Sequence, residues 1–197
     1  LDHIASLCQR YDVLVLSDEV YEHLVYDDAV HIPMASLPGM RERTISLSSA
    51  GKIFSMTGWK VGWATGPSNL LRAAQAAHQF LTFAIASPLQ HAVAAGLKMT
   101  VEGDYVATCK ADFTKRRNFL ADALTNAGFE VFMPQGTYFI LANFSRLHKE
   151  DDRAFAHVLA RDWGVAAIPP SVFYSQEKTA GAKLLRFSFC KKMETLK

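Results

Sequence analysis

The chain has few cysteines and no pattern that would use them together. Cys8, Cys109 and Cys190 lie far apart in 197 residues, without a Cys-x-x-Cys pair and without histidines at metal-ligand spacing. An odd, sparse set of this kind does not build a disulfide framework and favours a reducing compartment. The sequence therefore predicts neither a disulfide scaffold nor a metal site.

Long apolar runs and blocks of like charge are also missing. The 21 basic and 19 acidic residues give a formal net charge of +2, so charge offers no argument for nucleic acid or an anionic membrane as partner. No apolar run approaches the roughly 18 residues of a membrane-spanning helix, and no signal-peptide pattern opens the chain. We expect a cytoplasmic protein that binds neither nucleic acid nor membrane.

The residues present are those of a globular protein, half of them hydrophobic. The continuous apolar run 13–17 is typical of a strand buried on both faces of a parallel sheet. Because Leu1, Ile4, Ala5 and Cys8 already follow helical spacing, the chain is expected to begin inside a helix and to be part of a larger protein.

The remaining elements divide into two groups. The first group has strands near 44–47 and 61–66, followed by helices from 68 and from 87. The second group begins with a long helix to Ala127. After this helix, we expect strands at 129–133 and 137–142, a second helix at 152–163, and further strands at 165–168 and 183–190. That order is typical of a small α+β domain, so we predict domains 1–103 and 104–197.

The most informative stretch lies between the strands of the first group. Small residues, Ser48 to Gly51, end one strand and allow close approach of a ligand. Lys52 follows at once, and Lys60 precedes the next strand. A lysine in a partly dry pocket is suited to form a Schiff base with a carbonyl, whereas an isolated lysine is usually a solvated surface charge.

Neighbouring strand ends supply further polar side chains. Asp18 and Tyr21 follow one strand, Ser49 and Lys52 follow a second, and Lys60 precedes a third. Taken singly, the aspartate could cap a helix and the tyrosine could be a packed aromatic. Together they stand at the sheet edge where open α/β sheets bind ligands.

Five motifs, in this order along the chain, give it a resemblance to a known family. They are Ser17–Glu22, Ser49–Trp63, Pro134–Phe139, Ser171–Ser175 and Leu185–Phe189. The sequence resembles the fold-type I (class I/II) aminotransferases, which use pyridoxal 5′-phosphate (PLP), and is most similar to the kynurenine, glutamine and methionine aminotransferase branch. The resemblance implies an α/β fold: part of the large PLP-binding domain, followed by a small α+β C-terminal domain.

The resemblance implies a role for each residue of the first group. Lys52 would form a Schiff base with PLP and then act as general base. Asp18 would pair with the pyridine nitrogen, and Tyr21 would hydrogen-bond the phenolate oxygen. Ser49 and Lys60 would hold the phosphate; many relatives have an arginine where Lys60 stands.

The same resemblance implies how the substrate is bound. Arg186 would grip the substrate α-carboxylate, and Tyr174 would form part of the pocket wall. Phe83 would lie near the active site of the partner in a homodimer with a shared site. Kynurenine-preferring relatives have a histidine at the position of Ala84, and its absence here favours methionine or another medium-sized apolar amino acid.

Part of the family's pattern is not in this sequence. The Asn-Pro-containing segment, the phosphate-binding backbone amides and the aromatic residue that stacks on the pyridine ring all belong to the family's N-terminal half. We therefore expect a C-terminal portion of such an enzyme, whose sheet and site are completed by the missing N-terminal half.

The expected activity is transfer of an amino group from an L-amino acid (methionine, glutamine, aromatic or kynurenine-like) to a 2-oxo acid, in amino-acid metabolism. Two alternatives remain open. A carbon–sulfur β-lyase acting on cysteine conjugates or cystathionine would use the same lysine and cofactor. Less expected is the PLP-binding domain of a transcription regulator, which would keep Lys52 and Asp18 without turnover.

Overall fold

The computed structural model describes residues 1–177 and 179–197. The chain forms two compact units, Leu1–Thr108 and Cys109–Lys197. The boundary falls within helix α5 (Tyr105–Asn126), a few residues after Gly103, which ends helix α4 (Ser87–Glu102). The division into domains 1–103 and 104–197 stays a prediction, and the two units are treated separately below.

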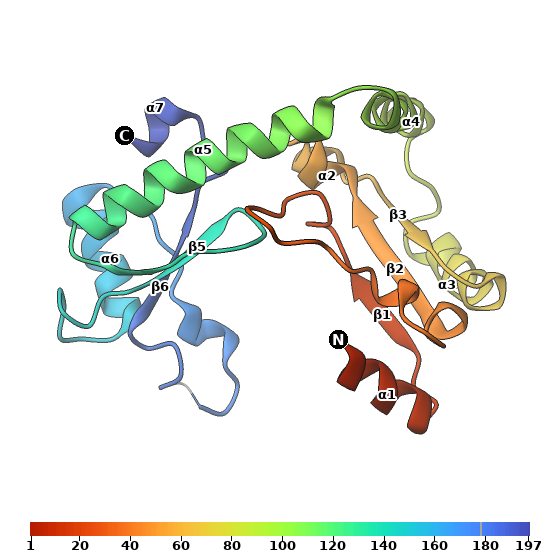
Figure 1. Cartoon of the computed structure of the whole chain (residues 1–197), viewed down its shortest axis with the longest axis horizontal. Coiled ribbons are helices and arrows are strands. Elements are labelled where there is room, and N and C mark those ends of the chain that lie inside the picture. Colours follow the sequence, from red (N-terminus) through yellow and green to blue (C-terminus); the bar gives the residue numbers. More distant parts are fainter. Residues whose placement is uncertain (178) are drawn as a thin grey trace. The chain divides into compact units, whose positions relative to one another are not determined.

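The first unit contains a three-stranded sheet. Strands β1 (Val15–Asp18), β2 (Thr44–Ser49) and β3 (Gly62–Thr65) lie in the order β1-β2-β3 (Figure 1). β1 runs parallel to β2, with Asp18 opposite Leu47, whereas β3 is antiparallel to β2, with Gly62 opposite Ser49. The parallel pairing ends β1 and β2 at the same edge of the sheet, so the residues that follow both strands gather there.

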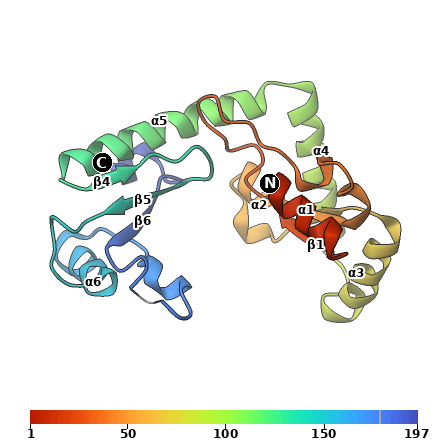
Figure 2. The ribbon, with the colours of Figure 1, turned by 60° about the horizontal axis from the view of Figure 1, so that its bottom comes forward.

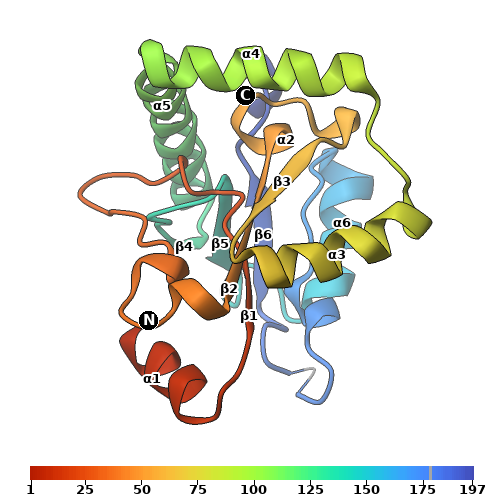
Figure 3. The ribbon, with the colours of Figure 1, turned by 90° about the vertical axis from the view of Figure 1, so that its right-hand side faces the viewer.

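Helices cover this sheet through small apolar clusters. Helix α4 contributes Leu89, Val93 and Leu97, which recur every four residues on one helical face, to a cluster that contains Ala50 and Phe54. Figure 3 shows α4 beside α2 (Ala50–Ile53), the short helix that follows β2. This cluster fixes α2 against the sheet edge.

Two further helices of the first unit differ in how far they are buried. Helix α1 (Asp2–Arg10) buries Ala5 and Cys8 against Met34 and Met40. Helix α3 (Ser68–Leu81) has no buried residue. Its last two residues, Phe80 and Leu81, are large apolar side chains that the described residues leave exposed.

The second unit is an antiparallel sheet packed against helices. Strands β4 (Glu130–Phe132), β5 (Phe139–Asn143) and β6 (Leu184–Ser188) lie in the order β4-β5-β6. Helix α6 (Asp152–Trp163) contacts β6, and Figure 2 shows these elements with α5. A short 3₁₀-helix, η4 (Pro170–Phe173), precedes β6, and α7 (Met193–Leu196) follows it.

The alternation along β6 separates the core of this unit from its open face. Leu185 and Phe187 are buried, and the Phe187 ring meets Phe129, which in turn stacks on Phe155 of α6. Because successive side chains of a strand point to opposite faces, Arg186 points away from this core.

Two expectations from the sequence were wrong. The strand predicted at 165–168 is only a single antiparallel bridge between Ile168 and Arg186, because the chain turns into η4 directly afterwards. The run 13–17 does contain β1, but it is not buried on both faces: Leu14 is 61% exposed and Leu16 is 72% exposed. β1 is an edge strand, and no described residue covers that face.

No helix among residues 1–177 and 179–197 has the length and apolar character needed to cross a bilayer.

We predict that residues 1–197 expressed alone will self-associate or will have a low melting temperature. β1 offers an open strand edge, and Leu16, Phe80 and Val101 are more than two-thirds exposed, so apolar surface and unpaired backbone groups face water. Size-exclusion chromatography with light scattering, together with calorimetry, checks this. A soluble monomer with one cooperative melting transition would contradict it.

Candidate active site

Asp18 and Tyr21 lie where the chain leaves the sheet. Asp18 is the last residue of β1, and its Oδ1 accepts a hydrogen bond of 3.4 Å from the Val20 N–H. The chain then makes consecutive turns, in which the N–H of Leu24 donates to the Tyr21 carbonyl at 2.8 Å. Asp18 is exposed and Tyr21 is half-buried, so both side chains remain near solvent at the sheet edge.

Ser49 and Lys52 lie at the end of the neighbouring strand. Ser49 is the last residue of β2, and its Oγ accepts a hydrogen bond of 3.1 Å from the Gly51 N–H, capping α2. A Cβ at Gly51 would lie 3.1 Å from the Thr57 Cα and 3.2 Å from the Ser49 Oγ, so only glycine fits without displacement. This tight strand-to-helix turn fixes the position of Lys52.

The structure brings Lys52 and Tyr21 together. The Lys52 Nζ lies 5.7 Å from the centroid of the Tyr21 ring, within the range of a cation–π contact. These residues are far apart in the chain and meet because β1 and β2 are parallel and end at the same edge. The sequence prediction that their strand ends converge is in agreement with this geometry.

Lys60 lies where the chain returns from α2 to the sheet. It follows the 3₁₀-helix η3 (Thr57–Trp59) and has φ +56°, a left-handed conformation that costs a non-glycine residue about 1 kcal/mol. The residues after Lys60 pack against the end of β2. The Ala50 N–H donates to the Val61 carbonyl. A Cβ at Gly62 would lie 2.7 Å from the Ser48 carbonyl oxygen. Lys60 and Ser49 therefore flank the segment that carries Lys52.

Phe83 lies in the connection between α3 and α4, and is 80% exposed. It has φ +68°, and its N–H donates to the His78 carbonyl at 3.0 Å, which ends α3. Together with Trp63, Ile85 and Val93 it lines an open hollow of about 390 Å³ that Lys52 does not line.

Glu19 lies at the edge of the candidate site, next to Asp18, and was not identified as a candidate residue from the sequence. It is 7% exposed, and its carboxylate accepts hydrogen bonds from the Met34 N–H at 3.1 Å and the Ser46 hydroxyl at 3.3 Å, while His31 Nε2 lies 3.1 Å away. The carboxylate thus joins the end of β1 to β2 and to the loop after Tyr21. Its place inside the Ser17–Glu22 motif, next to Asp18, was the available signal.

Opposing effects set the pKa of Glu19. Burial of the carboxyl raises its pKa, but hydrogen bonds from the side chains of His31 and Ser17 and from the Met34 N–H, with the charge of His31, outweigh burial and hold the pKa below its ordinary value. A carboxylate held in this way is a charged group that stabilises the turn.

We predict that Glu19→Gln lowers the stability of the full-length protein at pH 7 by about 1 kcal/mol, since a charge-assisted set of hydrogen bonds is weakened. A carboxyl whose pKa is lowered by folding stabilises the fold fully above its unfolded pKa of about 4.3 and loses this contribution as the pH falls through the lower folded value. The gap between wild type and variant should therefore shrink as the pH drops below about 4.3.

Thermal or denaturant unfolding at several pH values measures this gap. The matched control is Glu130→Gln, which changes an exposed glutamate on β4. A gap that stays the same from pH 7 to pH values well below about 4.3 would show that the charge of Glu19 contributes nothing.

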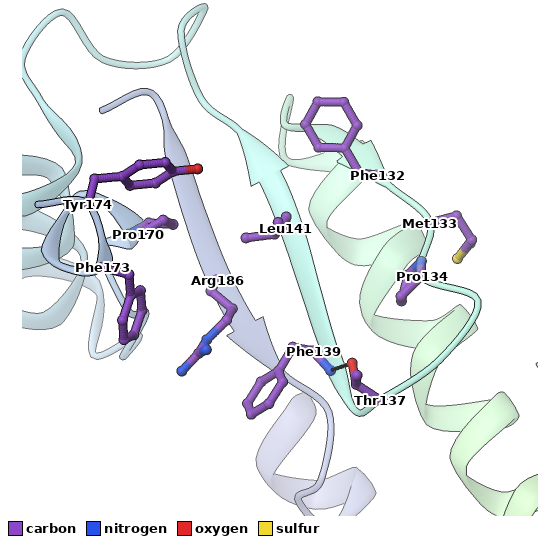
Figure 4. Close-up of a pocket in the computed structure, with 10 residues that line it drawn as sticks. All are labelled: Phe132, Met133, Pro134, Thr137, Phe139, Leu141, Pro170, Phe173, Tyr174 and Arg186. Carbon is purple, nitrogen blue, oxygen red and sulfur yellow. Dashed lines mark hydrogen bonds between the residues drawn. The ribbon is translucent and has the colours of Figure 1, made fainter. Parts of the chain in front are cut away.

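In the second unit, Arg186 and Tyr174 line one hollow. Arg186 sits on β6 opposite Leu141 and exchanges backbone hydrogen bonds of 2.9 and 3.0 Å with Ile168. Its Cζ lies 4.3 Å from the centroid of the Phe139 ring and 5.1 Å from that of Phe173 (Figure 4). The hollow has a volume of about 510 Å³ and a mostly apolar wall, lined by Phe132, Met133, Pro134, Thr137, Phe139, Leu141, Pro170, Phe173, Tyr174 and Arg186.

The candidate residues of the first unit and those of the second unit offer different chemical groups. The first unit offers a carboxylate, a phenol, a hydroxyl and two amines, and the second offers a guanidinium in an apolar hollow. Among residues 1–177 and 179–197, no group of three or more His, Cys, Asp or Glu side chains is placed to hold a metal ion.

Known proteins are similar to this chain in fold and in sequence. The N-succinyldiaminopimelate aminotransferase of Mycobacterium tuberculosis superposes with a TM-score of 0.92 at 44% identity, covering 98% of this chain and 50% of that chain. Escherichia coli YbdL, described as having a methionine aminotransferase function, gives a TM-score of 0.89 at 36% identity, covering 98% and 50%. Kynurenine–oxoglutarate transaminase of Dictyostelium discoideum is 39% identical over 215 residues, covering all of this chain and 49% of the relative.

The fold is therefore that of the aspartate-aminotransferase-like transferases, as the sequence resemblance implied. The family model for aminotransferase class I and II matches residues 1–197, and the chain belongs to that family. The chain spans about half the length of the curated relatives it matches.

Proposed function

We propose that the full-length protein is a PLP-dependent aminotransferase that moves an amino group from an L-amino acid to a 2-oxo acid. The observation that carries this proposal is the approach of the Lys52 amine to the Tyr21 ring, at the sheet edge where Asp18 and Ser49 also end their strands. Membership of the aminotransferase class I and II family supports it.

The donor set fits PLP in its chemistry. Asp18 offers a carboxylate to the pyridine nitrogen, and Tyr21 offers a hydroxyl to the ring oxygen. Ser49 and Lys60, at the two ends of the α2–η3 segment, offer a hydroxyl and a positive charge to the phosphate. Gly51 and Gly62 allow this segment to pack closely on neighbouring backbone, where a Cβ would not fit without displacement. When bound, the cofactor supplies an electron sink for the substrate's α-carbon.

The protein's own residues would hold and move protons around that carbon. We assign Lys52 to covalent attachment of the cofactor and to transfer of the α-proton, because its amine lies on the turn after β2, 5.7 Å from the centroid of the Tyr21 ring. Asp18 keeps its partner nitrogen protonated. Arg186 orients the substrate through its α-carboxylate, which a planar guanidinium can bind with two hydrogen bonds.

The wall around Arg186 favours substrates with apolar side chains. Of the nine residues that line this hollow besides Arg186, eight are aromatic, aliphatic, proline or methionine, and the only polar side-chain groups among the nine are the hydroxyls of Thr137 and Tyr174. A charged side chain would lose water there without gaining a partner. We therefore favour methionine or a related amino acid as donor, in line with the methionine aminotransferase function of YbdL.

We also propose a homodimer with a shared active site, in which Phe83 contributes to the partner's pocket. The exposure of Phe80, Leu81 and Phe83 supports this, since such a patch is usually covered by another surface. The N-terminal half that we expect to be missing would supply the remaining cofactor contacts.

We predict that Lys52→Ala in the full-length protein abolishes both covalent cofactor attachment and transamination, because no other amine occupies the turn after β2. Attachment is measured by borohydride reduction and mass spectrometry, and transamination by a coupled assay. Lys98→Ala, on the exposed face of α4, is the matched control. Retained attachment and turnover in Lys52→Ala would remove the central assignment.

We predict that Arg186→Ala raises the KM for the amino donor about tenfold or more and lowers kcat, while the cofactor stays bound, because a charged hydrogen-bonding partner of the carboxylate is lost. Steady-state kinetics and the cofactor absorbance spectrum measure these changes. Arg72→Ala, on α3, serves as control. An unchanged KM would show that Arg186 does not bind the substrate.

An assay of the full-length protein with cystathionine separates transamination from β-elimination. Pyruvate release from cystathionine without any 2-oxo acid would favour a lyase. A helix-turn-helix module encoded upstream would favour a regulator.

A further inference from the structure

We propose that Phe139 and Phe173 are positioning residues that bracket the Arg186 guanidinium and hold its plane ready for a substrate carboxylate. This inference rests on the proposed function, since it assigns a role to the surroundings of Arg186. It concerns the second unit only.

The bracket is formed by two aromatic rings from two elements. Figure 4 shows the Arg186 side chain extending between Phe139 of β5 and Phe173 of η4. Ring centroids lie 4.3 and 5.1 Å from the guanidinium carbon, both well inside the range of about 6 Å in which a cation is attracted to an aromatic face.

Polar contacts do not compete with these rings. The Arg186 Nε is buried and has no hydrogen-bond partner among the described residues, and no acidic side chain of residues 1–177 and 179–197 pairs with the guanidinium. An internal carboxylate would occupy the donors that a substrate carboxylate needs. Aromatic faces orient the group and leave its donors available.

The fold holds both rings in place. Phe139 is two residues before Leu141, the strand partner of Arg186, and its N–H donates to the Thr137 hydroxyl at 3.2 Å. On the other side, the buried Asp152 of α6 accepts a hydrogen bond of 2.7 Å from the Ser171 N–H and so anchors η4. Phe173 is therefore delivered by a segment tied to α6 and, through Ile168, to β6.

A bracket has a different consequence from a plain apolar wall. If the rings only packed against substrate side chains, their loss would matter for large apolar donors and not for the carboxylate. If they orient Arg186, their loss weakens binding of any carboxylate, whatever its side chain. Because flexible arginine must then be ordered on binding, the effect falls mainly on KM.

The test uses full-length, PLP-loaded protein and propionate, a carboxylate with almost no side chain, as competitive inhibitor. Phe139→Leu and Phe173→Leu remove a ring, whereas Phe139→Tyr and Phe173→Tyr keep it. We expect each leucine variant to raise the Ki of propionate about three- to thirty-fold, the range for loss of one cation–π contact, with tyrosine variants near wild type.

Two controls make the readout specific. Trp163→Leu changes an exposed aromatic residue of α6 outside this hollow and should leave the Ki unchanged. The tyrosine variants of Phe139 and Phe173, which keep the ring, are the second control and should bind propionate as wild type does. Phe173 is 64% exposed, so its leucine variant carries the test even if Phe139→Leu fails to fold.

The outcomes separate this inference from the function on which it rests. If Arg186→Ala leaves the Ki of propionate unchanged, the carboxylate role of Arg186 is wrong. If Arg186→Ala raises the Ki but Phe173→Leu does not, or if Phe173→Tyr raises it as much as Phe173→Leu, only the bracket is overturned.

Discussion

The parallel pairing of β1 with β2 is the constraint on which the candidate site depends. It places Asp18 opposite Leu47, so the turn after β1 and the turn after β2 emerge at the same edge. Tyr21 belongs to the first turn and Lys52 to the second, and their approach to 5.7 Å follows from that register. A slip of one residue would turn every side chain of the strand to the other face of the sheet.

Close approach of backbone segments gives this edge its shape. Ser49 caps α2, Gly51 fits against Thr57, and Gly62 fits against the Ser48 carbonyl. Between these contacts, Lys60 is held in a left-handed conformation. The buried Glu19 carboxylate ties the loop beyond Tyr21 to β2, so the site edge is maintained by a charged group that faces inward rather than toward a ligand.

In the second unit, the side chains of β6 alternate between the two faces of the sheet. One face carries core residues, and the other carries the proposed substrate-binding residue. Leu185 and Phe187 enter the core, whereas Arg186 lies between them on the other face. The open face of this small sheet is thus available for a guanidinium and two aromatic rings, with the helix-covered face providing stability. The anchoring of η4 by Asp152 shows how a residue of the helical layer supports the open face.

The amino-acid sequence alone determined the family, the order of the main elements and the candidate residues Lys52, Asp18, Tyr21, Ser49, Lys60 and Arg186, because these are carried by short motifs and local periodicity. Their assigned roles stay predictions. Tertiary structure decided what depends on contacts between distant segments. The run 165–168 became one bridge, Glu19 was found buried among partners from two other segments, and Arg186 was found between Phe139 and Phe173. No periodicity encodes such contacts, since each joins residues that only folding brings together.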